Sequence, residues 1–120
     1  MNGRDRQICR KLLAETAVMR DLLEGISLAA LCRMNAQRAV SMTLINIGEL
    51  VKTLTDETRA AHPHIPWRAI AGMRDVSAHK YQTLRREDVY KTCVEDVPYF
   101  EKQISDMLKN DPTGVENYDP

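Results

Sequence analysis

Apolar residues return at helical intervals along most of the chain, which predicts four amphipathic helices. In the clearest stripe the apolar positions are separated by four, three, four and three residues: Val40, Leu44, Ile47, Val51 and Leu54. Similar stripes predict helices over 4–23, from Pro66 onward, and from about residue 85 to 108. No stretch alternates between apolar and polar residues as a half-buried strand does. The pattern therefore predicts an all-α fold.

The residues between these stripes are typical of helix ends. Gly25 is expected to end the first helix, Ser27 to cap a short turn, and Asn35 to be the N-cap of the second helix. A short extra helix is expected over 56–61, before the proline-rich segment 62–66. A kink is expected at Pro98, inside the fourth helix. Four such helices with short connections predict an up-down four-helix bundle.

Length and composition narrow this picture. The chain has 120 residues, which predicts one domain, with the bundle over 1–109 and a disordered tail over 110–120, where periodicity ends. Basic and acidic residues balance at 17 each, which argues against a protein that binds nucleic acid through bulk positive charge. No signal peptide or membrane span is expected, so we predict a cytoplasmic protein without a membrane partner. The cysteines fit no zinc pattern and are interpreted as small buried hydrophobes: Cys9, Cys32 and Cys93.

The segment 74–81 combines an arginine, an aspartate, a histidine and a tyrosine in the pattern R-x-x-x-x-H-x-Y. Asp75 lies four residues before His79, so on a helix it can orient the imidazole and favour its charged form. Arg74 offers a planar guanidinium that matches phosphate oxygens. These groups suit phosphodiester cleavage without a metal or cofactor, and RNA carries its own nucleophile, the 2′-hydroxyl. The alternative is an ordinary surface ion-pair cluster.

Arg74 and His79 do not point the same way on an ideal helix, because five residues turn the chain by about 140°. Three arrangements would bring them together: the long reach of the arginine, a helix that ends near His79, or a second copy of the site across a dimer. Lys80, Arg85 and Arg86 could form a rim that guides phosphates, or simply a solvated face.

Other side chains have a simpler interpretation beside the functional one. His62 and His64 could bind a metal, but no third ligand is evident, and a solvated loop is the alternative. Trp67 is expected to anchor the core rather than to stack on a base. Glu49 is expected to be a capped or solvated carboxylate.

A series of short motifs resembles the HepT-like ribonuclease toxins of the HEPN superfamily. In order they are Ile47-Gly48-Glu49, Ile65-Pro66-Trp67, Ile70-Ala71-Gly72-Met73-Arg74-Asp75, His79-Lys80-Tyr81 and Glu95-Asp96-Val97-Pro98. The resemblance covers roughly residues 5 to 108. It implies a HEPN-like homodimeric helical bundle in which the motifs of two subunits line one cleft. It also implies a metal-independent endoribonuclease that acts as the toxin of a type VII-like toxin–antitoxin pair.

The resemblance also assigns roles to residues. Arg74 and His79 are the implied catalytic pair, with Asp75 in support. Tyr81 is the implied acceptor of AMP from an MntA-type minimal nucleotidyltransferase antitoxin, and the added charge and bulk would block RNA. Lys80 stands where such proteins often have glycine, so it could strengthen phosphate binding or alter the modification site. Two other hypotheses remain: a catalytically silent binding partner of a nucleotidyltransferase, and a purely structural dimeric bundle.

Overall fold

The computed structural model of the chain describes residues 1–24, 34–75 and 86–111, and every element in these ranges is helical. Two long helices, α1 (Gly3–Leu23) and α2 (Met34–Thr53), pack along each other. The chain continues through α3 (Asp56–Ala61), α4 (Trp67–Ala71) and a 3₁₀ turn, η2 (Gly72–Asp75). It ends in α6 (Arg86–Lys91), a π-helical segment η3 (Thr92–Asp96) and α7 (Val97–Lys109). The predicted all-α class is confirmed.

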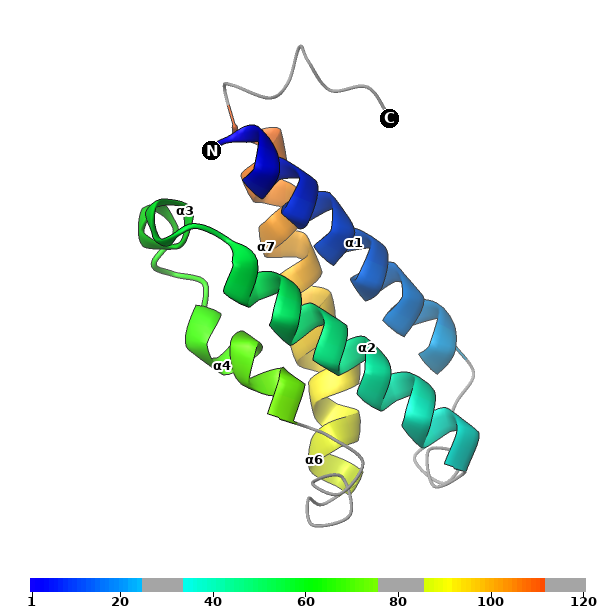
Figure 1. Cartoon of the computed structure of the whole chain (residues 1–120). Helices are drawn as coiled ribbons and strands as arrows, with labels where there is room; N and C mark the ends of the chain where they lie inside the picture. Colours follow the sequence, from blue (N-terminus) through cyan, green and yellow to red (C-terminus); the bar gives the residue numbers. More distant parts are fainter. Residues whose placement is uncertain (25–33, 76–85, 112–120) are drawn as a thin grey trace.

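The helices surround one core (Figure 1). α1 packs against both α2 and α7, while α4 and η2 pack on α2 at the side away from α1. All five residues of the predicted α2 stripe are buried: Val40, Leu44, Ile47, Val51 and Leu54. The apolar stripe of the C-terminal helix is also buried from Val89 to Ile104, and near its end Met107 is more deeply buried than Leu108. Helical periodicity therefore predicted the core well.

The predictions of the helix ends were less accurate than the prediction of the core. The short helix over 56–61 is confirmed, and Pro66 is the N-cap of α4. Asn35 as an N-cap is wrong, because Met34 is already helical and an N-cap needs a non-helical backbone. The predictions for Gly25 and Ser27 lie outside the described residues.

A π-helical segment lies just before Pro98, where the sequence predicts a kink. Pro98 occupies the first turn of α7, where its missing N–H costs little. The backbone N–H of Val97 donates to the carbonyl of Thr92, five residues earlier. The wider turn offers one way to continue a helix past a proline, because a proline in a regular α-helix removes a hydrogen bond and crowds the preceding turn.

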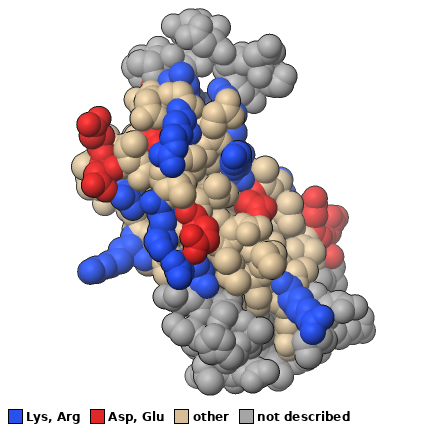
Figure 2. Space-filling view, viewed as in Figure 1, with Lys and Arg blue, Asp and Glu red and all other residues tan. Residues whose placement is uncertain are grey.

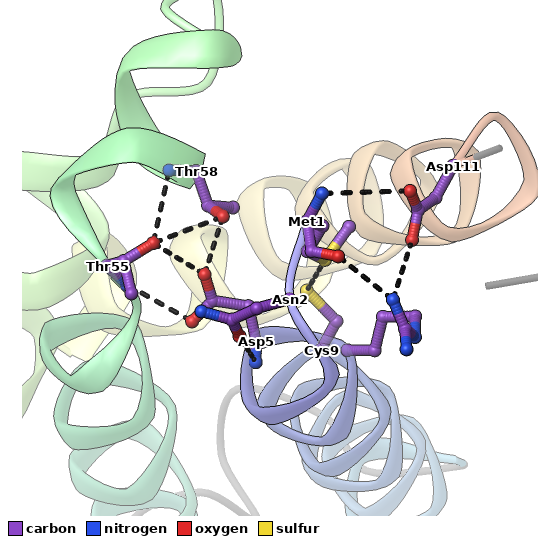
Figure 3. A network of polar contacts seen from close by, with 8 residues as sticks. Met1, Asn2, Asp5, Cys9, Thr55, Thr58 and Asp111 are labelled. Carbon is purple, nitrogen blue, oxygen red and sulfur yellow. Dashed lines mark hydrogen bonds and ion pairs between the residues drawn. The ribbon is translucent and has the colours of Figure 1, made fainter. Parts of the chain in front are cut away.

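A buried aspartate, Asp5, joins the start of α1 to the start of α3 (Figure 3). Its carboxylate accepts hydrogen bonds from the Thr55 N–H at 3.2 Å, the Thr55 hydroxyl at 2.6 Å and the Thr58 hydroxyl at 2.5 Å. Thr55 is also the N-cap of α3, and it accepts from the Thr58 N–H. This network fixes the turn between α2 and α3.

The N-terminus is held against the end of α7 (Figure 3). Asp111 is buried, and its carboxylate lies 3.8 Å from the Met1 ammonium and 3.6 Å from the Arg6 guanidinium. The packed structure therefore includes Asp111, two residues beyond the boundary expected at 109. The rest of the predicted tail, 112–120, lies outside the described residues.

Candidate functional site

Gly48 of α2 is the point at which the turn that carries Arg74 meets the rest of the fold. A Cβ atom added at Gly48 would lie 2.7 Å from the backbone nitrogen of Arg74 and 2.8 Å from the carbonyl oxygen of Ala71. Both distances are shorter than real Cβ contacts. Only glycine lets the η2 backbone lie this close to α2. The position of Arg74 in the fold thus depends on a residue 26 positions earlier.

The next residue of α2 holds the Arg74 side chain. A guanidinium nitrogen of Arg74 lies 3.2 Å from a carboxylate oxygen of Glu49. The two side chains are 40% and 51% exposed, so a phosphate could reach the guanidinium from solvent. An ion pair this exposed contributes at most about 1 kcal/mol to stability. Its main effect is on the orientation of the guanidinium.

The Glu49 side chain is 51% exposed, in agreement with the interpretation as a solvated carboxylate, but its pairing with Arg74 was not predicted. Spacing within the α2 segment could not reveal its partner, because Arg74 reaches it only through the packing of η2 on α2. The motif Ile47-Gly48-Glu49 was the available signal. It places the residue that permits the close approach directly before the residue that binds the arginine.

Arg74 lies on a 3₁₀ turn rather than on the continuous α-helix that the sequence predicted. α4 ends at Ala71, and the tighter turn follows through Asp75. The angle of about 140° between Arg74 and His79, which assumes an α-helix, therefore does not apply. His79, Lys80 and Tyr81 lie outside the described residues, as does the side chain of Asp75. The convergence of these groups stays a prediction.

Charged side chains of both signs lie among uncharged ones on the face that carries α1, α2 and α4 (Figure 2). The exposed basic residues of α2, α4 and η2 include Lys52, Arg68 and Arg74. Glu49 is the acidic group paired with Arg74 on this surface. The balanced charge of the whole chain therefore coexists with exposed basic residues on the elements that carry Glu49 and Arg74. The side chains of Lys80, Arg85 and Arg86, predicted to form a rim, lie outside the described residues.

Trp67 anchors α4 in the core, as predicted. Its ring packs edge to face on Phe100 with 6.2 Å between ring centroids. Its indole N–H donates to the carbonyls of Arg59 and His62, each at 3.0 Å. This arrangement fixes the turn that precedes α4, and so the start of the segment leading to Arg74.

The histidine pair lies on that turn. The rings of His62 and His64 are 6.1 Å apart, and burial followed by repulsion from His64 lowers the pKa of His62. No group of three or more potential metal ligands occurs among residues 1–24, 34–75 and 86–111. Within the same ranges, no helix is both long and apolar enough to cross a bilayer.

Two of the three cysteines are buried free thiols, as predicted. Cys9 lies in α1 and Cys93 in η3, and burial raises the pKa of each to about 12. Such thiols remain protonated at neutral pH and behave as small apolar side chains. Cys32 lies outside the described residues.

Comparison with known proteins identifies the family of the chain. A sequence model described as ribonuclease HepT-like matches residues 12–107. A candidate RNase of Caldanaerobacter subterraneus subsp. tengcongensis is 32% identical over 107 residues, covering 88% of this chain and 96% of the relative. The probable ribonuclease HepT of Thermococcus cleftensis is 35% identical over 79 residues, covering 66% of this chain and 72% of the relative. No solved structure matches the chain. The extent of these matches shows that the chain belongs to the HepT-like ribonuclease family.

Proposed function

We propose that this chain is a metal-independent endoribonuclease in which Arg74 and His79 act on one phosphodiester. The observation that carries the proposal is the way in which the fold positions Arg74. Gly48 admits its backbone, and Glu49 holds its guanidinium at the surface. A half-exposed, oriented guanidinium is suited to a phosphate group. The family match supports RNA as the substrate.

In the proposed reaction the RNA supplies the nucleophile. His79 accepts the proton of the 2′-hydroxyl while the 2′-oxygen bonds to phosphorus. The bond from phosphorus to the 5′-oxygen breaks, and the leaving oxygen takes a proton from an imidazolium or from water. The products are a 2′,3′-cyclic phosphate and a 5′-hydroxyl. Arg74 stabilises the negative charge that develops on the phosphoryl oxygens, while Asp75 orients the imidazole and Lys80 attracts phosphate.

Cleavage of RNA by the purified chain in EDTA tests this proposal. Arg74→Ala and His79→Ala are each expected to lower the cleavage rate at least about 100-fold. Arg38→Ala is the matched control, because Arg38 is an exposed arginine of α2 outside the proposed pair. Unchanged cleavage in His79→Ala would remove His79 from the mechanism. No cleavage by the wild-type chain would favour a silent partner of a nucleotidyltransferase.

We infer further that the active form is a homodimer joined near this site. Met42 is 58% exposed and lies seven residues before Glu49, so both occupy one face of α2. A large apolar side chain at that place favours contact with a second copy. Met42→Glu is expected to yield monomers with reduced cleavage, measured by light scattering and by RNA decay. Val94→Glu, at another exposed apolar residue, should remain dimeric.

The proposed biological role is that of a toxin, inactivated when an MntA-type nucleotidyltransferase adds AMP to Tyr81. The position of Tyr81, two residues after His79, supports this role, because the added phosphate would repel RNA there. Tyr81→Phe should retain RNase activity and escape inactivation. Intact-mass measurement after incubation with the partner and ATP tests this, since AMP still found on the variant would place the acceptor elsewhere. Growth arrest on expression without the partner, absent in His79→Ala, tests toxicity.

A further inference from the structure

A hollow of about 280 Å³ lies between α7 and the turn that joins α3 to α4. One wall is the turn, with His62 and His64. The other wall is a single face of α7, whose lining residues recur with the helical period: Tyr99, Lys102, Gln103, Asp106, Met107 and Asn110. The hollow lies at the turn before α4, whereas Arg74 lies near the C-terminal end of the α4–η2 segment. The hollow is therefore separate from the ribonuclease site proposed above.

Gln103 is the feature that distinguishes this hollow from an ordinary surface depression. Gln103 is only 8% exposed, yet its side-chain amide makes no hydrogen bond to any other residue in the described ranges. No side-chain atom of Gln103 is both fully buried and without a hydrogen-bond partner, so its amide remains in contact with solvent at the hollow. The buried Asp5 shows the usual arrangement, since Thr55 and Thr58 satisfy its carboxylate. The amide of Gln103 is thus available to a ligand in the hollow.

The other side chains around Gln103 indicate the chemistry of that ligand. Lys102 offers an exposed ammonium and His64 an exposed imidazole. Neither side chain forms an ion pair with the residues described. Both can donate to phosphate oxygens. Tyr99 is 62% exposed and offers an aromatic face to a base. Asp106 is the carboxylate in the lining, and it can accept from a ribose hydroxyl or a base amino group.

We propose that this hollow binds a single nucleotide, with its phosphate at Lys102 and His64, its base on Tyr99 and a hydrogen bond to Gln103. Small-molecule pockets generally measure about 300–1,000 Å³, so a hollow of about 280 Å³ lies at the lower limit and restricts the ligand to one nucleotide. The nucleotide can be free in solution or one unit of an RNA strand. The site is independent of Arg74, so it stands whether or not the chain cleaves RNA.

Isothermal titration of the full chain with three probes distinguishes these sources: inorganic phosphate, AMP and a short 2′-O-methyl oligoadenylate. The methylated strand cannot be cleaved through a 2′-hydroxyl, so binding is measured without reaction. Emission from Trp67, the one tryptophan, is a second readout, because its indole donates to the His62 carbonyl on the wall of the hollow. Tighter binding of AMP indicates a free nucleotide, and tighter binding of the strand indicates a second contact for RNA.

Two variants and one control test the assignment. Lys102→Glu should weaken the binding of the tighter-binding probe at least about tenfold. Lys109→Glu changes an exposed lysine of the same helix outside the lining, and should leave that affinity unchanged. Gln103→Leu should weaken binding while the melting temperature is kept, because the amide has no hydrogen bond to the described residues that the change would remove. Absence of saturable binding by every probe would overturn the proposal. Equal losses in the two lysine variants, or unchanged binding in Gln103→Leu, would overturn it too.

Discussion

The guanidinium of Arg74 lies 3.2 Å from the carboxylate of Glu49, the residue that follows the glycine on which the Arg74 backbone packs. Two consecutive residues of α2 therefore control one arginine in different ways. Gly48 determines where its backbone lies, and Glu49 determines where its charge points. Because an exposed ion pair adds little stability, the pairing is better explained by the orientation of a functional group than by the needs of the fold.

Gly48→Ala should disturb the Arg74 turn. The new methyl group would meet the Arg74 nitrogen at 2.7 Å and the Ala71 carbonyl at 2.8 Å, so α2 and η2 must separate. We expect the free energy of unfolding to fall by about 1–3 kcal/mol, the usual cost of overpacking, and RNA cleavage to fall with it. Urea unfolding and the initial cleavage rate measure the two effects.

Gly72→Ala is the control, because a Cβ atom at Gly72 would meet nothing within 4 Å and its φ of −66° suits alanine. It should leave stability unchanged or raise it by up to about 1 kcal/mol. Equal stability and activity in the two alanine variants would contradict the packing argument.

Glu49→Gln should lower both kinetic constants, each for a different reason. Without the carboxylate the guanidinium loses its orientation, so we expect kcat to fall about tenfold. The loss of a negative charge beside the guanidinium should also lower KM for RNA by about two- to fivefold, the range of an exposed charge pair. Glu57→Gln, at an exposed residue of α3, makes the same change in charge away from Arg74. A fall in KM alone, equal in both variants, would show that only the overall charge matters.

The core could be predicted from the sequence because periodicity directly records which face of a helix is buried. The predicted stripe from Val40 to Leu54 is buried throughout, and so are Ile70 and Phe100. The pairing of Glu49 with Arg74 could not be predicted in this way. It arises from the packing of a 3₁₀ turn on α2. The hydrophobic pattern of one segment does not indicate where the other segment packs.

Buried polar groups were the other feature that the sequence did not reveal. Asp5 resembles an ordinary charged residue in the first turn of a helix, yet it is fully buried. Its partners, Thr55 and Thr58, lie about fifty residues away in sequence. The same difficulty applies to Gln103, which lies on the apolar side of α7 without a side-chain partner in the described ranges.

Asp5→Ala should be among the more destabilising single changes outside the apolar core. It leaves the Thr55 N–H and the hydroxyls of Thr55 and Thr58 without their acceptor in a buried place. We expect a loss of about 2–4 kcal/mol in the free energy of unfolding, measured in urea. Asp56→Ala, whose side chain is 97% exposed, should cost less than about 1 kcal/mol. Similar losses at the two positions would contradict the assigned network.

The contribution of Asp5 should also depend on pH. Burial raises the pKa of its carboxyl, but the hydrogen bonds from Thr55 and Thr58 outweigh burial, and the pKa is lowered overall. A lowered pKa in the folded state means that the stabilisation is complete above the unfolded pKa, about 4, and is lost as the pH falls through the folded pKa. The stability difference between wild type and Asp5→Asn should therefore shrink below about pH 4. A constant difference down to pH 2 would show that ionisation of Asp5 is not involved.

Cys9 and Cys93 should resist alkylation as long as the chain is folded. Both are at most 1% exposed, and burial raises the pKa of each to about 12, with Asp5 and Asp111 adding to the effect at Cys9. At pH 8 only about one thiol in ten thousand would then be ionised, and the thiolate is the reactive form. Peptide mass spectrometry after treatment with iodoacetamide should show both sites labelled slowly in buffer and rapidly in urea. Free glutathione provides the rate of an unburied thiol, and native labelling at a comparable rate would place these sulfurs at the surface, in conflict with the packing of α1 against η3 and α7.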